Sequence, residues 1–197
     1  MKKILSLCLV LLANSAAFAT DPQVLIKTTQ GDITVRLFAD KSPITVANFL
    51  AYVDNGHYKG VIFHRVIPGF MIQTGGFNKA MQERPTLPPI KNEAKNRVHN
   101  ERKTLAMART NDPDSATAQF FINVRNNFQL DWSPRNDGYT VFGEVTDGMF
   151  AVDSIALVET GSFGGHQDVP VEPITIVDVV RLAEGETAAS KKTIRLE

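Results

Sequence analysis

The chain has 197 residues and a single cysteine, and its 21 basic and 21 acidic side chains give a formal net charge of zero. This balance excludes the class of nucleic-acid binders that depend on a large basic surplus. The length suits one domain of ordinary size with a buried core.

Residues 1–19 have the pattern of a secretory signal peptide. A basic start at Met1–Lys3 precedes an apolar run at Ile4–Leu12, and Ala17-Phe18-Ala19 fits the small-x-small cleavage pattern. We therefore predict cleavage after Ala19 and export to the periplasm, which leaves 178 of the 197 residues. The alternative is an uncleaved membrane anchor, but the apolar run is shorter than the roughly 20 residues that span a bilayer.

Cleavage would remove Cys8 together with Lys2 and Lys3. The mature chain would then have neither a disulfide nor thiol chemistry, and it would carry two more acidic than basic residues. No later apolar stretch approaches membrane-spanning length, so we expect no membrane association after cleavage.

Short strand-like runs dominate the chain from residue 24 onward. Val24–Ile26 and Ile33–Phe38 flank a turn at residues 30–32, and Ser42-Pro43 is typical of a helix start with Ser42 as the N-cap. Apolar residues at helical spacing continue this helix to Asn55-Gly56. Further strands are expected at residues 61–67, 70–73, 104–108, 119–124, 139–145 and 174–182, with a second helix at 149–155.

Two polar segments interrupt this pattern. Residues 78–101 contain three prolines and predict a long loop, and residues 184–197 predict a polar tail that frays. Residues 20–183 therefore form the expected domain. Many short strands with only two helices predict a mainly β protein, an antiparallel sandwich or barrel, and the pattern alone leaves closure open.

The segment at residues 63–76, FHRVIPGFMIQTGG, places an arginine and a Pro-Gly bend among large hydrophobic residues. In a strand Phe63, Arg65 and Ile67 share one face, whereas His64 and Val66 share the other. The plain interpretation is a hairpin with Arg65 as a solvated edge charge, because arginine is rarely buried unpaired.

Residues 63–76 also closely resemble the signature segment of the cyclophilins, the proline isomerases that bind cyclosporin. Gln119–Asn123, Thr140–Val145 and Thr104–Arg109 resemble three further segments of that family, and the resemblance runs from about residue 24 to residue 182. It implies a closed eight-stranded antiparallel barrel capped by two α-helices. It also implies a shallow groove on the outside of the barrel, where an X-Pro peptide docks.

By position, the resemblance implies that Arg65 is the catalytic cation and that Gln73 assists it. Gln73 and Gln119 would hydrogen-bond the peptide backbone or orient Arg65. The implied substrate-binding residues are Phe70, Met71 and Phe121 in the proline pocket, Leu130 in its wall, Ala108 and Arg109 near the residue before proline, and Gln119 and Tyr139.

The chemistry of proline isomerisation agrees with these residue types. Rotation about an X-Pro amide breaks no bond between heavy atoms and moves no proton, so it needs no nucleophile, cofactor or metal ion. A permanent cation can stabilise the prolyl nitrogen or the turning carbonyl, and an apolar wall can hold the ring. The four histidines show no spacing typical of metal ligands, so no metal site is expected.

One position departs from the family pattern. Cyclosporin-sensitive members have a tryptophan eight residues after the position of Phe121, where this chain has Gln129, and Phe128 lies one residue away. We therefore expect weak cyclosporin binding, and it stays open which of Phe128 and Gln129 takes that place.

We thus predict a monomeric peptidyl-prolyl cis-trans isomerase that acts on proline-containing peptides and unfolded exported proteins. A non-enzymatic chaperone that binds peptides in the same groove is the alternative. A lipocalin-like barrel is less favoured, because such barrels bind ligands inside the lumen.

Overall fold

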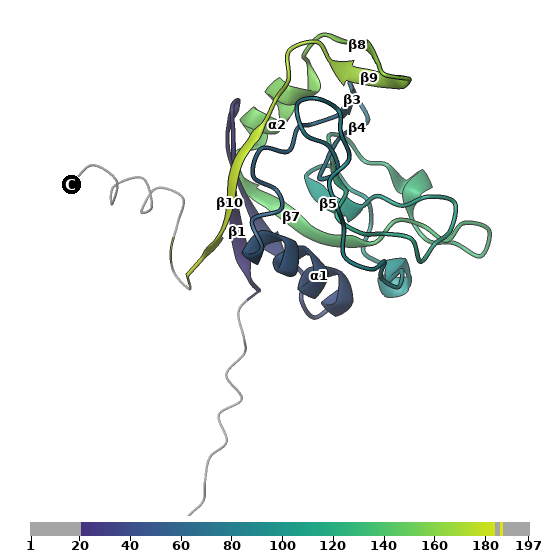
Figure 1. Ribbon diagram of the computed structural model, residues 1–197. Coiled ribbons are helices and arrows are strands. Elements are labelled where there is room, and N and C mark those ends of the chain that lie inside the picture. The colour runs from purple at the N-terminus through teal and green to yellow at the C-terminus, as the bar shows by residue number, and fades with distance from the viewer. Residues whose placement is uncertain (1–20, 184–185, 187–197) are drawn as a thin grey trace, which may run out of the picture.

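The computed structural model describes residues 21–183 and residue 186 (Figure 1). The predicted signal peptide and all but residue 186 of the predicted tail lie outside the described residues, so both stay predictions. Within residues 21–183, no helix is long and apolar enough to span a bilayer.

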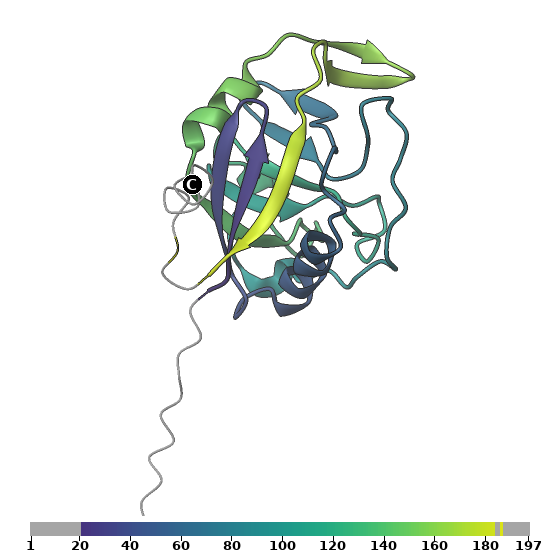
Figure 2. The same ribbon diagram turned by 60° about the vertical axis from the view of Figure 1, so that its left-hand side comes forward.

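One eight-stranded antiparallel sheet organises the chain, in the order β10-β1-β2-β7-β5-β6-β4-β3. Its strands are β1 (Gln23–Thr28), β2 (Gly31–Leu37), β3 (Arg65–Ile67), β4 (Met71–Thr74), β5 (Thr104–Met107), β6 (Phe120–Asn123), β7 (Val141–Asp147) and β10 (Ile176–Leu182). The sheet curls, and the helices α1 (Pro43–Asp54) and α2 (Met149–Ala156) lie at its lower and upper ends in Figures 1 and 2. The mainly β prediction with two helices is confirmed.

The predicted closed barrel is wrong, because the sheet is open and β10 and β3 are its two edge strands. The residues just before these strands do meet, since Ile62 forms one bridge with Thr175 and the amide of Phe63 donates to Ile174 O at 2.9 Å. Ile176, the first residue of β10, also donates to Val61 O at 2.7 Å and accepts from the amide of Gly60 at 2.8 Å. Within residues 21–183 this short contact is an isolated bridge that precedes β3, and β3 itself does not pair with β10.

Helix α1 begins as predicted, but its N-terminus is capped differently. The Ser42 hydroxyl donates to Val141 O at 2.7 Å instead of capping the helix. The carboxylate of Glu93 accepts hydrogen bonds from the amides of Ile44 and Thr45, at 3.1 and 2.8 Å. A carboxylate at this end satisfies free amides and complements the helix dipole. The long polar loop that carries Glu93 is thereby fixed to α1.

The apolar side chains form two clusters on opposite faces of the curled sheet. Phe120 on β6 packs edge-on against Phe49 of α1, with ring centroids 5.4 Å apart, inside the main core. The next residue, Phe121, joins a smaller outer cluster with Met71 and Val141. Successive residues of a strand face opposite sides, so one strand supplies both clusters. The outer cluster becomes the floor of the groove described below.

Candidate active site

A groove of about 550 Å³ lies over the outer cluster and is lined by sixteen residues. All ten side chains that the sequence singled out are among them. They are Arg65, Phe70, Met71, Gln73, Ala108, Arg109, Gln119, Phe121, Leu130 and Tyr139. The structure thus brings the predicted site together, whereas the role of each residue stays a prediction.

The floor of the groove is an apolar shelf. Met71 and Phe121 are almost fully buried, and Phe70 and Leu130 pack against them while partly exposed. The ring of Phe121 meets that of Tyr139 edge-on at 5.7 Å. A flat, partly dry surface of this kind suits a small saturated ring such as that of proline.

Buried asparagines hold the shelf from behind. The side-chain amide of Asn127 donates to Phe70 O at 2.9 Å and to Asn123 Oδ1 at 2.7 Å. Asn123 in turn donates to Asn100 Oδ1 at 3.2 Å, and all three asparagines are fully buried. Because buried amides must find partners, this network fixes the turn that carries Phe70 relative to β6.

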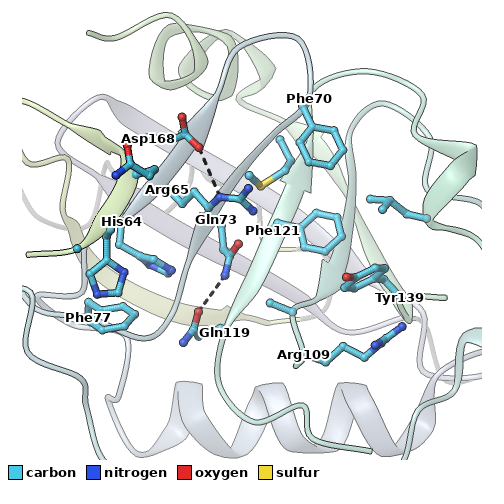
Figure 3. Close-up of a pocket in the computed structure, with 16 residues that line it drawn as sticks. His64, Arg65, Phe70, Gln73, Phe77, Arg109, Gln119, Phe121, Tyr139 and Asp168 are labelled. Atoms are coloured by element: carbon cyan, nitrogen blue, oxygen red, sulfur yellow. Dashed lines mark hydrogen bonds and ion pairs between the residues drawn. The ribbon is translucent and has the colours of Figure 1, made fainter. Parts of the chain in front are cut away.

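The pairing of strands β3, β4 and β6 places Arg65 beside this shelf. It pairs with Gln73 across β3 and β4, and Gln73 pairs with Phe121 across β4 and β6. Paired residues share a face, so the three side chains form a row. Figure 3 shows the guanidinium over the groove, and the Arg65 side chain is 45% exposed.

The two glutamines bond to each other. Gln73 Nε2 donates to Gln119 Oε1 at 2.9 Å (Figure 3). Among residues 21–183, neither makes a hydrogen bond to Arg65. The carbonyl of Gln73 remains available to a peptide backbone, which is one of the two roles expected for the glutamines, whereas the Gln119 side chain also lies within hydrogen-bonding reach of His64.

Arg109 lines the groove on the side opposite Arg65 (Figure 3). Its guanidinium lies 4.6 Å from the centre of the Tyr139 ring, and Nε donates to Gly138 O at 3.0 Å. A further bond joins Nη1 to Thr110 O at 2.8 Å. These contacts orient Arg109 and leave Arg65 as the cation beside the shelf.

The comparisons with known proteins agree with this geometry. A model of the family described as "Cyclophilin type peptidyl-prolyl cis-trans isomerase/CLD" matches residues 23–181. The chain belongs to this family. It is 53% identical over 165 residues to a peptidyl-prolyl cis-trans isomerase of Acinetobacter baylyi, covering 84% of this chain and 88% of that protein. Peptidyl-prolyl cis-trans isomerase B of Escherichia coli is 55% identical over 159 residues, covering 79% and 97%.

Solved structures give the same result. A cyclophilin-type peptidyl-prolyl cis-trans isomerase of Cryptosporidium parvum superposes with a TM-score of 0.67 at 29% identity, covering 83% of this chain and 98% of that one. The predictions of a cyclophilin and of a peptidyl-prolyl cis-trans isomerase are confirmed. Among residues 21–183 and 186, no three His, Cys, Asp or Glu side chains gather as a metal site.

This cyclophilin has a second set of groove residues that the sequence did not single out. A separate hairpin of β8 (Thr160–Phe163) and β9 (His166–Pro170) projects at the top of Figures 1 and 2. Its residues 165–168 line the groove. The Gly164-Gly165 pair between two short runs was the available signal, because two glycines are typical of a tight hairpin turn.

His64 also lines the groove, although it was predicted to face away from Arg65. Strand β3 begins only at Arg65, so strict alternation does not extend to His64 or to Phe63, which enters the main core. His64 is 5% exposed and packs on Phe77 with ring centroids 4.7 Å apart. Burial, with a contribution from nearby His166, lowers the pKa of His64 from 6.5 to about 4.

The open question at the family's tryptophan position has a structural answer. Neither Phe128 nor Gln129 lines the groove, whereas Leu130 does. Phe128 is 52% exposed, and its ring lies against His99 at 5.7 Å. Gln129 is exposed too, and its amide lies 3.4 Å from Asn127 Oδ1. This edge of the groove therefore has no aromatic wall.

The lowered pKa of His64 predicts a pH dependence of stability. Between pH 6.5 and about 4 the unfolded chain binds a proton at His64 that the folded chain does not bind. The free energy of unfolding should therefore fall as the pH drops through this window, by about 3 kcal/mol from this residue once below it, with no cost above pH 6.5.

Urea denaturation at pH 7.5 and pH 4.5 checks this prediction. The His64→Gln variant should lose less stability between the two pH values than the wild type does, because it removes the titrating group. Equal losses in the two proteins would contradict the prediction.

Proposed function

We propose that the X-Pro bond turns above the shelf, with Arg65 as the catalytic residue. The observation that carries this proposal is the row Arg65–Gln73–Phe121, which places a permanent cation next to an apolar floor. The proline ring would rest on the floor, and the peptide backbone would bond to the glutamine pair. A structure of the Cryptosporidium parvum relative in the presence of the dipeptide Ala-Pro, with a TM-score of 0.66 and 29% identity, supports a prolyl ligand.

The proposed mechanism follows from the electronic change during rotation. Turning the amide out of its plane removes resonance, at a cost of about 18–20 kcal/mol, and returns a lone pair to the prolyl nitrogen. Arg65 can donate a hydrogen bond to that nitrogen or to the turning carbonyl oxygen. The bond is stronger in the transition state than in the planar ground state, so it lowers the barrier. Neither a covalent intermediate nor a metal ion enters this proposal.

Replacement of Arg65 tests the proposal. The Arg65→Ala variant should lose isomerase activity by about 100-fold or more, because one preorganised donor is lost. NMR exchange or protease-coupled assays on an Ala-Pro peptide would measure kcat/KM. The Arg102→Ala variant is the matched control, since Arg102 is an exposed arginine that pairs with Asp153. Wild-type turnover in Arg65→Ala would refute the catalytic assignment.

We further propose that the substrates are unfolded exported proteins, met by a monomeric enzyme in the periplasm. The support is the basic start, apolar run and Ala17-Phe18-Ala19 pattern of residues 1–19. A folding catalyst is useful in that compartment, because uncatalysed X-Pro exchange takes tens to hundreds of seconds.

Cell fractionation tests export. In a Gram-negative host the wild type should accumulate in the periplasm with Thr20 as its first residue, as determined by mass spectrometry. Replacing Ala17 and Ala19 by leucine should block cleavage, because bulky residues do not fit the processing site. A chain that lacks residues 2–19 is the control and should stay in the cytoplasm. Full-length wild type in the cytoplasm would argue against export.

We also propose that cyclosporin binds weakly. The edge of the groove at Gln129 offers no aromatic wall, so calorimetry should give a Kd of about 1 µM or weaker. The Gln129→Trp variant should bind about tenfold more tightly or better, because position 129 is where cyclosporin-sensitive members have their tryptophan and the larger ring adds an apolar contact beside Leu130 of the groove. Phe128→Ala is the control and should leave the Kd unchanged, since the Phe128 ring lies against His99. A nanomolar Kd for the wild type would contradict this proposal.

A further inference from the structure

The hairpin of β8 and β9 brings a carboxylate to Arg65. Asp168 Oδ2 lies 3.7 Å from Arg65 Nε, and the pair is drawn in Figure 3. We propose that Asp168 is a positioning residue, which holds the Nε edge of the guanidinium so that its two terminal NH2 groups face the peptide. This inference rests on the proposed role of Arg65 and adds a residue to it.

Arg65 needs an external partner to keep one orientation. Its side chain is 45% exposed, and an arginine has several rotatable bonds whose freedom must be restrained. Among residues 21–183 and 186, Asp168 is its only ion-pair partner, and no side-chain hydrogen bond holds Arg65. Catalysis by a preorganised donor requires a favoured direction, and this contact is the one that biases the direction of the guanidinium.

The backbone of Asp168 has an uncommon conformation. Its φ of 60° lies in the left-handed region, which residues other than glycine rarely adopt, and it falls where the register of the hairpin shifts between Gly161 and Phe163. The next residue, Val169, is buried, and it pairs with Gly161 across the hairpin. The base of the hairpin is closed by Thr160 opposite Pro170. An uncommon backbone conformation that is fixed by its surroundings at a groove is typical of functional positions.

A role in stability does not explain this contact. The Asp168 side chain is 41% exposed, and the distance of 3.7 Å exceeds that of a hydrogen bond. Exposed ion pairs of this kind contribute little to the free energy of unfolding. The expected effect of Asp168 is therefore on the rate of the reaction. A competing effect has the opposite sign, because a carboxylate near Arg65 also reduces the positive potential that the substrate meets.

The experiment measures kcat and KM separately, together with Tm, on an uncharged Ala-Pro peptide. Asp168→Asn should lower kcat about tenfold, a part of the roughly 100-fold cost of misplacing a catalytic group, while KM changes less than about twofold and Tm stays constant. Asp168→Glu should recover part of kcat. Asp153→Asn is the control, because Asp153 pairs with Arg102 at similar exposure on another part of the surface. It should behave as wild type.

A double-mutant comparison decides whether Asp168 acts through Arg65. In an Arg65→Ala background, Asp168→Asn should have no further effect on kcat. An unchanged or higher kcat for Asp168→Asn alone, or the same loss in both backgrounds, would overturn the inference. Wild-type activity of Arg65→Ala would instead overturn the proposed function, so the two failures are distinguishable.

Discussion

The groove depends on the way successive side chains of strand β6 face opposite sides of the sheet. Phe120 points into the main core, where it meets Phe49 and Phe142, and Phe121 points outward to form the floor of the groove. Because both rings belong to one buried strand, packing of the core also fixes the height and tilt of the groove floor. A shift of β6 by one residue would exchange the two faces, so the interior and the active site are specified together.

The exposure of the Arg65 guanidinium is the second feature of the groove, beside its packed floor. Burying an arginine without a partner would be costly, and the structure leaves Arg65 about half exposed, so water solvates it while the groove is empty. In the proposed mechanism a bound peptide displaces that water and lowers the local dielectric, which would strengthen the hydrogen bond from Arg65 to the rotating amide. The neutral His64 beside it adds no second positive charge to the groove at neutral pH.

Sequence reasoning found the ten predicted groove residues because the segments that carry them are long and specific, and strand register then aligned Arg65 with Phe121. Sequence reasoning failed where a residue from a distant segment forms the hydrogen bond or ion pair that a nearby residue was expected to form. The local sequence predicted Ser42 as the N-cap, yet Glu93 from a distant loop accepts the hydrogen bond from the helix amide of Thr45. The same applies to the open sheet, which depends on how residues 60–63 meet residues 174–176, and to Asp168, since the sequence near Arg65 does not specify its partner.

The separation of the β8–β9 hairpin from the main sheet has a consequence for protein engineering. Its two strands pair only with each other, so the eight-stranded ladder does not depend on the sequence of the hairpin. Residues 165–167 can therefore change, within the limits of the tight turn, without altering the core that supports the floor. Exchanging residues 165–167 between relatives, with Asp168 kept, would therefore alter the wall that a peptide meets and leave the pairing of β3, β4 and β6 unchanged.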